Sequence, residues 1–464
     1  MPANAPRSNL LTYLMGLLVL IAALGIRVYY LHEFQFIDSP PSQVWQVQGR
    51  GLISVPPDIT ELDQLVANIK KDGIINGFQS KAPLGPDKEE LTAHRAPLYP
   101  VLRAGIEQGA EKVNEYVTIS QPAAVRYLQA VLGAFTCLLY YMIAWRGFGR
   151  HQLLALLVGL AAAAYPFWVI NVGELEDGVL TSFLLAWSLY LGVSIGQQGG
   201  TIRPLLLGVV LAALTLTRAA LLPFAVVIQL WFCLRCRRVP QGWMGCILMI
   251  AGFAGGLAPW LLHGFQTFHK PIPVVSSAWF HLWVGNNQAS DGSDYQWAMK
   301  KRLDPALVTK LEQTPQEERY ALLAETVVNE VIEKPWEACK HRLKSLLQFI
   351  SGTNALTGNV YWQGDKAPAP PGWLKPALVG SFILLLVLAF LGWRWSYGWK
   401  NESAPLSLAI FWIPLPYILS HAGTFHTARL PLDGVLIVLA CLGLLCLLPG
   451  IGARILAGEQ EDKS

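Results

Sequence analysis

The sequence is poor in charged residues. Asp, Glu, Lys and Arg make up 14% of its 464 residues, whereas hydrophobic residues make up 53%. A soluble globular domain carries about 25% charged residues. The chain cannot cover a soluble surface with so little charge, which excludes a soluble enzyme, a nucleic-acid-binding protein and a disordered protein.

The chain also lacks a cysteine framework. Of its seven cysteines, only Cys339 lies in a long polar segment, and the others lie in or beside apolar runs. This distribution offers no set of disulfides outside a membrane. Cys233 and Cys236 form a CxxC pair, but a zinc site of that type needs a second pair and the sequence has none.

Long apolar runs are what the sequence has in place of charge. A helix needs about 20 apolar residues to cross a bilayer. The apolar runs lie at 10–31, 121–145, 152–171, 177–196, 204–217, 219–234, 241–263, 372–393, 404–421 and 430–449. They predict an all-α polytopic membrane protein with about ten transmembrane helices. The first run is long and lacks a small-residue cleavage site, so we expect an anchor and not a removed signal peptide.

The basic residues indicate how the spans are oriented. The net charge is +4, and one set of basic residues falls on a single side if the spans alternate. That set is Arg7, Arg146, Arg150, Arg203, Arg235, Arg237, Arg238, Arg394, Lys400, Arg454 and Lys463. Short loops rich in Lys and Arg stay cytoplasmic. We therefore expect both termini in the cytoplasm and these residues at the inner membrane surface.

Two long segments, 32–120 and 264–371, then face the extracytoplasmic side. Apolar residues at helical spacing predict interfacial helices from Ile59 onward and at 316–334 and 336–350, with a break at Pro335. Pro- and Gly-rich stretches at 39–57, 80–100 and 364–372 predict loops. We expect three parts: a transmembrane module at 1–263 carrying the first loop, the second extracytoplasmic segment at 264–371, and C-terminal transmembrane helices at 372–464.

Asp58 is the candidate general base. It lies in the first outer segment, where a carboxylate at the lipid interface could take a proton from an attacking hydroxyl or amine. Glu61 follows three residues later, which is also the pattern of a helix capping box. The two roles are compatible, and both remain open. Asp38 and Asp63 are poorer candidates because one lies early in the loop and the other lies within the predicted helix.

A cluster of acids lies between the third and fourth spans. Glu174, Glu176 and Asp177 occur within four residues, flanked by apolar sequence. Their oxygens could bind a divalent cation or orient a sugar. Equally, they could be solvated acids near the start of a helix, where negative charge is favourable. A divalent cation here is the only cofactor that the sequence suggests, and no metal ligand is assigned.

Three arginines lie at the outer ends of different spans or in the first outer loop. Arg95, Arg218 and Arg429 are therefore exceptions to the positive-inside rule, by which most Lys and Arg residues lie on the cytoplasmic side. A guanidinium can bind a phosphate through two parallel hydrogen bonds, although such arginines can also extend toward lipid head groups. His426 lies close to Arg429 and is a further candidate for substrate contact.

A carboxamide pair follows the seventh span. Asn286 and Asn287 end the stretch WVGNN, in a region that also contains Trp260, Trp279 and Trp297. Most of these aromatics are expected in the interfacial belt. Some could stack on a sugar, and the two asparagines are candidate substrate contacts. Carboxylates, arginines and carboxamides therefore gather on the outer side, which suits a phosphate leaving group and a hydroxylated substrate.

Six segments, in chain order, resemble the GT-C superfamily of polytopic membrane glycosyltransferases and, within it, the PMT/ArnT-like group (glycosyltransferase family 39). They are AHRAPLYPVL (93–102), RYLQAVLGAFTCLLYYMIAWRGFGR (126–150), AAAAYPFWVINVGELEDGVLTSFLLAW (161–187), LLLGVVLAALTLTRAALLPF (205–224), APWLLHGFQTFHKPIPVVSSAWFHLWVGNN (258–287) and ARLPLDGVLIVLA (428–440). The likeness covers most of the chain.

The resemblance implies a transferase that uses a polyprenyl-phosphate-linked sugar as donor. The acceptor, a lipid, glycan or protein, would be attacked on the extracytoplasmic side with inversion at the anomeric carbon. By the same resemblance, Asp58 would be the first-loop aspartate, and Glu176 or Asp177 the second acid. Arg429 would contact the donor phosphate, and Tyr99 lies with Arg95 in the first matching segment as a candidate substrate contact.

Two other functions remain to be separated from this one. An enzyme of similar membrane architecture could join or polymerise lipid-linked glycans. A transporter is less favoured, because its charges should lie near the membrane midplane and its halves should repeat, and this sequence shows neither. The predicted outer side carries no Asn-x-Ser/Thr site and the C-terminus no retention signal, which favours a bacterial inner membrane.

Overall fold

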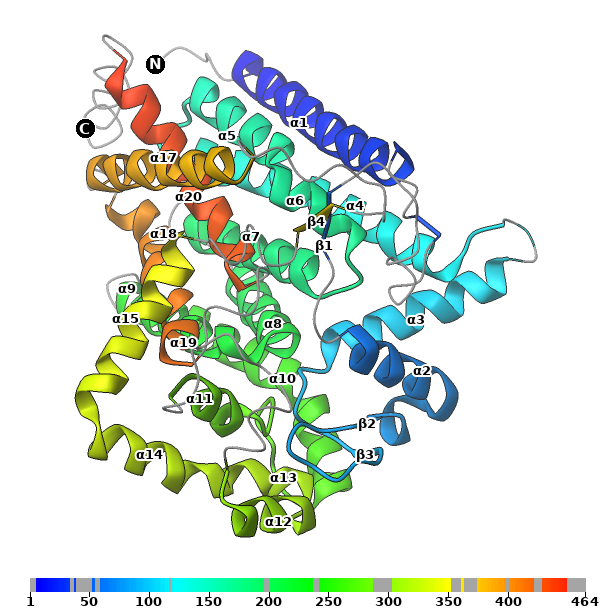
Figure 1. The fold of residues 1–464 in the computed structure, drawn as a ribbon. Helices are drawn as coiled ribbons and strands as arrows, with labels where there is room; N and C mark the ends of the chain where they lie inside the picture. The colour runs from blue at the N-terminus through cyan, green and yellow to red at the C-terminus, as the bar shows by residue number, and fades with distance from the viewer. Residues whose placement is uncertain are drawn as a thin grey trace.

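The computed structural model describes residues 6–33, 37–38, 52–54, 59–114, 116, 118–195, 201–236, 242–286, 303–351, 360–362, 374–396, 400–420 and 428–448. Within them, most of the chain is helical and the two sheets are small (Figure 1). β1 (Leu52–Ser54) pairs antiparallel with β4 (Val360–Trp362). β2 (Gln79–Ser80) pairs antiparallel with β3 (Glu90–Leu91).

The apolar runs of the sequence are helices in the structure. Among the described residues, five are long and apolar enough to cross a membrane: α1 (Pro6–Glu33), α4 (Gln121–Gly147), α7 (Gly178–Ile195), α10 (Gly242–Phe268) and α20 (Leu430–Leu447). α5 (Gln152–Ala164) and α6 with η2 (Pro166–Gly173) pass the same test together and are bent by 51°, as in a broken span or a re-entrant loop. Shorter apolar helices are α8 (Ile202–Thr217), α9 (Leu222–Cys236), α17 (Leu374–Trp395), α18 (Lys400–Trp412) and α19 (Pro414–Leu419). The predicted all-α polytopic fold is confirmed.

Small residues let two pairs of these helices pack closely. Between α8 and α10, a Cβ added at Gly208 would overlap the carbonyl oxygen of Met249. Between α17 and α20, a Cβ at Gly392 would overlap the carbonyl oxygen of Leu439. Close backbone approach at small residues is how membrane helices associate, since lipid tails are as apolar as leucine side chains.

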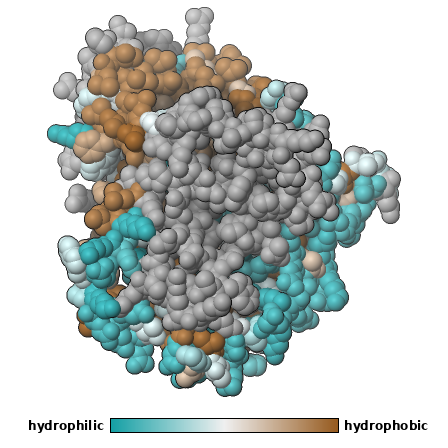
Figure 2. Space-filling model, in the orientation of Figure 1, coloured by the Kyte–Doolittle hydropathy of each residue, from teal (hydrophilic) through white to brown (hydrophobic). Residues whose placement is uncertain are grey.

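The outward-facing side chains of the long helices are apolar. On α1, Leu10 and Ile21 are 64% and 61% exposed, and on α17, Phe390 is 62% exposed. Figure 2 shows apolar side chains gathered on the upper part of the visible face, whereas the lower part is mainly hydrophilic. This is the surface expected of an integral membrane protein, with lipid against the apolar helices and water against the outer segments.

The two outer segments form a helical layer beside the spans. The first holds α2 (Ile59–Asn76) and α3 (Leu98–Val113). The second holds α11 (Ala278–Asn286), α12 (Pro305–Gln313), α13 (Gln316–Arg319), η5 (Tyr320–Leu322), α14 (Leu323–Glu333) and α15 (Pro335–Ser351). The helix expected from Ile59 is confirmed, as is the break near Pro335, which begins α15. Helices α3, α11 and α12 were not expected from the sequence.

Candidate active site

One cavity lies where the outer segments meet the ends of the spans. Its volume is about 640 Å³, and its walls come from α2, α3, the start of α7, the α8–α9 junction at η3 (Ala219–Leu221), α11 and α19. Most of the lining is apolar. The polar and ionisable side chains on it are His94, Arg95, Tyr99, Glu176, Asp177, Thr217, Arg218, Ser277, His281, Tyr417 and Ser420.

An ion pair forms part of the cavity wall. Arg218 donates from Nε to Oδ2 of Asp177 at 2.8 Å, and its second nitrogen donates to Oδ1. The hydroxyl of Thr181 also reaches Oδ2, at 3.4 Å. The pair therefore joins the start of α7 to the end of α8, and the charge of Arg218 is balanced by a neighbouring carboxylate. Glu176 lines the same region. We call Glu176, Asp177 and Arg218 the acidic end.

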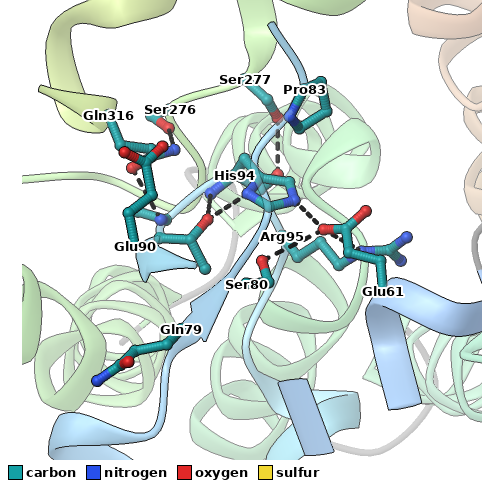
Figure 3. A network of polar contacts seen from close by, with 12 residues as sticks. Glu61, Gln79, Ser80, Pro83, Glu90, His94, Arg95, Ser276, Ser277 and Gln316 are labelled. Carbon is teal, nitrogen blue, oxygen red and sulfur yellow. Dashed lines mark hydrogen bonds and ion pairs between the residues drawn. The ribbon is translucent and has the colours of Figure 1, made fainter. Parts of the chain in front are cut away.

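A second polar group comes from the segment between β3 and α3 (Figure 3). His94 bonds through Nε2 to Glu61 of α2, and Nε of Arg95 donates to the same carboxylate oxygen at 3.4 Å. Burial favours the neutral form of Glu61, but the charges of His94 and Arg95 outweigh it and hold the pKa of Glu61 well below its usual range. Glu61 thus stays ionised beneath His94 and Arg95, which line the cavity.

Hydrogen bonds from the second outer segment hold the segment between β3 and α3 in place. The backbone nitrogen of Ala93 donates to Oε1 of Gln316 at 3.0 Å, and its carbonyl accepts from the nitrogen of Ser276 at 2.9 Å. Ser277 donates to the carbonyl of His94 at 2.8 Å. Gln316 also donates to Ser276 at 2.6 Å. Figure 3 shows Gln316, Ser276 and Ser277 around the segment that carries His94 and Arg95. The hydrogen bonds from these three residues fix the position of that segment.

Farther from the cavity, an ion pair also joins the first outer segment to the second. Arg319 is 1% exposed and binds both carboxylate oxygens of Glu90, and its Nε donates to the carbonyl of Leu311 at 2.8 Å. The hydroxyl of Tyr320 donates to the carbonyl of Pro83 at 2.9 Å. The β2–β3 hairpin and the α12–η5 region are therefore packed as one unit.

His281 faces the cavity from α11. Burial first, and then the positive charges of His94 and Arg95, lower its pKa to about 4 against the opposing effect of Glu61. At neutral pH the imidazole is therefore uncharged. We call His94, Arg95 and His281 the basic wall.

Tyr99 lines the cavity from the start of α3. Its hydroxyl donates to Oε1 of Gln129 at 2.9 Å, and burial raises its pKa.

Glu174, the first acid of the 174–177 cluster, does not line the cavity. Its carboxylate accepts from Asn171 at 2.6 Å, and it is 5% exposed. The three acids of the 174–177 cluster are thus divided, with Glu176 and Asp177 on the cavity and Glu174 outside its lining.

Two further predicted contacts are not among the residues that line the cavity. Asn286 donates to the carbonyls of Leu282 at 2.8 Å and Leu419 at 3.1 Å, so it joins α11 to α19. Arg429 precedes α20 and donates from Nε to Asp433 at 2.9 Å. Its guanidinium lies 3.7 Å from the ring centre of Phe382. Ala428, the residue before it, does line the cavity.

Three predicted residues, Asp58, Asn287 and His426, lie outside the described residues. Among the described residues, no group of three or more His, Cys, Asp or Glu side chains is arranged to hold a metal ion.

Sequence reasoning did not identify His94, His281 or Gln316. A signal existed for His94, which is adjacent to Arg95 in the first segment that resembles the family. Glu61 was noted only as a capping partner of Asp58, whereas its carboxylate binds residues more than thirty positions away. Gln316 and His281 carry no local signal, because their roles depend on contacts between distant segments.

No protein-family model and no curated protein matches the sequence. Among solved structures, the chain is similar to the archaeal oligosaccharyltransferase AglB from Archaeoglobus fulgidus in complex with an inhibitory peptide and a dolichol-phosphate. The TM-score is 0.50 at 13% identity, over 92% of this chain and 50% of AglB. This chain therefore spans about half the length of that protein.

Weaker likenesses involve two further structures. The Archaeoglobus fulgidus oligosaccharyltransferase tethered with an acceptor peptide gives a TM-score of 0.46 at 12% identity, over 97% of this chain and 53% of that one. ArnT from Cupriavidus metallidurans bound to undecaprenyl phosphate gives 0.32 at 12% identity, over 94% and 77%. The AglB likeness shows the fold alone. The chain has the helical membrane-protein fold that AglB also has.

Proposed function

We propose that this protein is an integral membrane glycosyltransferase. It moves a sugar from a polyprenyl-phosphate-linked donor to a hydroxyl or amine of an acceptor on the extracytoplasmic side. The acceptor is a lipid, a glycan or a protein, and the membrane is a bacterial inner membrane. The proposal rests on the six sequence segments, the fold shared with AglB and, above all, the cavity.

The observation that carries the proposal is the composition of that cavity. Its apolar walls come from the ends of apolar helices and from the two outer segments, and its polar side chains include two guanidinium groups and two carboxylates. A volume of about 640 Å³ lies within the range of small-ligand sites, roughly 300–1,000 Å³, and suits a sugar phosphate. A site of this kind can take a lipid chain from the membrane side and a polar head group at its centre.

The reaction that fits is a direct displacement. The acceptor oxygen or nitrogen forms a bond to the anomeric carbon as the bond from that carbon to the phosphate oxygen breaks. The acceptor proton goes to a general base, and polyprenyl phosphate leaves with the bonding electrons. Attack from the face opposite the phosphate inverts the anomeric configuration. The protein must therefore place a base and an anion site on opposite sides of the sugar.

We assign Asp58 as the base. Ile59, the next residue, begins α2, and Leu62 of α2 lines the cavity. Asp177 is less suited to act as the base, because both of its carboxylate oxygens already accept hydrogen bonds from Arg218. In this proposal, Glu176, Asp177 and Arg218 orient the acceptor or the sugar hydroxyls.

In this proposal, Tyr99 and Arg95 contact the donor. Arg429, which follows Ala428 in the chain, contacts the donor phosphate. Glu174 and Asn286 support the site through their bonds to Asn171 and to the α19 carbonyl of Leu419. Asn287 and His426 remain proposed substrate contacts from the sequence alone.

Turnover of a polyprenyl-phosphate monosaccharide by the purified protein in detergent tests the proposal. Release of polyprenyl phosphate together with sugar transfer to an added acceptor supports it. The control is the Asp58→Asn protein, which should bind the donor without turnover. Turnover only with a lipid-linked oligosaccharide would replace the proposal by a glycan ligase or polymerase, and binding without turnover of either donor would remove the enzymatic function.

A further inference from the structure

The connection between η2 and α7 carries two acids of the cavity, and side chains of other helices hold its backbone. Carbonyl groups at the end of a helix lack partners within that helix. Here the four consecutive carbonyls of residues 172–175 lie against side chains of α3 and α4. Residues 176 and 177 lie between this anchored stretch and the first residue of α7, and both line the cavity.

Gln129 of α4 holds two of these carbonyls and also a side chain of the cavity wall. Its amide nitrogen donates to the carbonyls of Val172 at 3.0 Å and Glu174 at 2.6 Å. Its Oε1 accepts from the hydroxyl of Tyr99 at 2.9 Å. The amide thus uses both of its hydrogens and its oxygen, and turning it over would place the oxygen against two carbonyl oxygens. Gln129 is 3% exposed, so water does not compete for these bonds.

Two buried arginines hold the other two carbonyls. Nε of Arg126, on the turn of α4 before Gln129, donates to the carbonyl of Gly173 at 2.9 Å. Arg103 of α3 reaches the carbonyl of Leu175 at 3.5 Å. The backbone just before the two acids is therefore fixed to both α3 and α4.

We propose that Gln129 is a positioning residue, which sets the placement of Glu176 and Asp177 relative to Tyr99. The inference rests on the proposed function and takes the two acids as contacts of the acceptor. Gln129 acts through these side chains, because one amide joins the α3 wall of the cavity to the connection before α7. A misplacement of about 1 Å can cost about a hundredfold in rate. Loss of the amide should therefore impair use of the acceptor more than use of the donor.

The first experiment measures the position of the acids without requiring turnover. Glu176→Cys places a thiol on the cavity wall, and its modification by a water-soluble maleimide is followed in the full-length protein in detergent. Mass spectrometry of the peptide that contains residue 176 separates this thiol from the native cysteines. Gln129→Met keeps the length of the side chain and removes its three hydrogen bonds. Added to Glu176→Cys, it should change the modification rate by about fivefold or more, because thiol reactivity follows exposure and surroundings.

A second variant breaks the same link with a smaller change. Tyr99→Phe deletes one oxygen and should change the maleimide rate in the same direction. Because both substitutions break one link, their effects should not add, and Gln129→Met/Tyr99→Phe should behave as Gln129→Met alone. If Gln129→Met does not fold, Tyr99→Phe decides.

Thr136→Val is the matched control. Thr136 lies on the same helix, is 1% exposed and is not part of the cavity lining. Its hydroxyl donates to the carbonyl of Leu132 at 2.8 Å. The substitution removes a buried hydrogen bond of α4 without touching the connection, so the maleimide rate should stay as in the parent protein.

The second experiment uses native Glu176 and measures turnover. Gln129→Met should raise the KM for the acceptor about tenfold or more and leave the KM for the donor within about threefold. Partial unfolding would lower the apparent kcat and change neither KM. The split between the two KM values therefore separates positioning from a general loss of stability.

The outcomes distinguish this inference from the proposed function. Absence of turnover in the wild type with every donor overturns the proposed function, and the maleimide rates still decide whether Gln129 places residue 176. Maleimide rates that are unchanged in Gln129→Met and Tyr99→Phe, or effects of the two that simply add, overturn the inference. The proposed function then stands wherever the wild-type protein turns over its donor.

Discussion

Arg218 and Asp177 face each other across the junction of α7 and α8, with two hydrogen bonds between the guanidinium and the carboxylate. Their side chains are 14% and 20% exposed, so the pair is largely removed from solvent. Breaking a buried pair by removing one partner costs about 3–5 kcal/mol, and the residual exposure here reduces that figure.

We therefore expect Arg218→Met to lower the free energy of unfolding by about 1–3 kcal/mol. The double variant Arg218→Met/Asp177→Leu should recover most of the loss, because no unpaired charge remains. Unfolding in detergent, monitored by circular dichroism, provides the measurement. Asp87→Asn, which breaks an exposed pair with Lys81, should change stability by less than about 1 kcal/mol. Equal losses in the single and double variants would contradict the assignment.

Arg429 requires a design that separates stability from donor binding. Asp433 is fully buried beside it, so Arg429→Ala should destabilise the protein by about 3–5 kcal/mol whatever its role in binding. Arg429→Ala/Asp433→Asn removes both charges. If Arg429 contacts the donor phosphate, the double variant should fold and show a donor KM raised about tenfold or more. Arg429→Lys should restore donor use only partly, since lysine lacks the planar fork. A normal KM in the double variant would leave Arg429 a structural role.

Asp58 can be tested by two substitutions with opposite expectations. Asparagine caps a helix about as well as aspartate but is not a base. Asp58→Asn should therefore keep its melting temperature and lose turnover by about 10²–10⁴-fold. If Asp58 only caps α2, Asp58→Asn would be nearly silent and Asp58→Ala would cost about 1 kcal/mol of stability. Full activity in Asp58→Asn would redirect the search for a base to Asp63 or to Glu176 and Asp177.

The Glu61–His94–Arg95 contact predicts how stability depends on pH. The pKa of Glu61 is lower in the folded protein than in the unfolded chain, so its ionisation stabilises the fold above the unfolded value of about 4.3. That contribution is lost as the pH falls below this value toward the folded pKa. Glu61→Gln should flatten the stability profile below about pH 4. Glu333→Gln, at an exposed position, should leave the profile unchanged, and an unaltered profile in Glu61→Gln would argue against the ion pair.

The orientation of the chain is open to a reporter experiment. A reporter fused after Arg150 or Arg238 should be cytoplasmic, and one inserted near Asn287 or Lys310 should be extracytoplasmic, because short basic loops stay inside. Detection of a reporter near Asn287 in the cytoplasm would place the cavity on the wrong side for the proposed reaction.

The apolar runs predicted where the apolar helices lie, because hydrophobic length is a local property. About ten spans were expected, and among the described residues five helices, or six with the bent pair, are long and apolar enough to cross a membrane. Outer helices were predicted where apolar spacing is regular, as from Ile59, and missed where prolines suggested a loop, as at Leu98 in α3. In α3, Pro97 precedes the helix and Pro100 lies in its first turn, where the missing N–H has no cost.

The site was predicted as single residues and not as pairs. Arg218 and Asp177 were both chosen, but nothing in their 41-residue separation indicates that one holds the other. Glu174 and Glu176 are two residues apart and diverge because they lie in the short connection between η2 (Asn171–Gly173) and α7. Such divergence depends on the backbone path, which composition and spacing do not specify.

The contact between Ala93 and Gln316 has a consequence for the order in which the protein is made. Ala93, next to His94 and Arg95, emerges from the ribosome 223 residues before Gln316. The early helices can insert into the membrane while this segment still lacks Gln316, Ser276 and Ser277. The basic wall is therefore completed only late in synthesis, after the segment that contains Gln316 has been made.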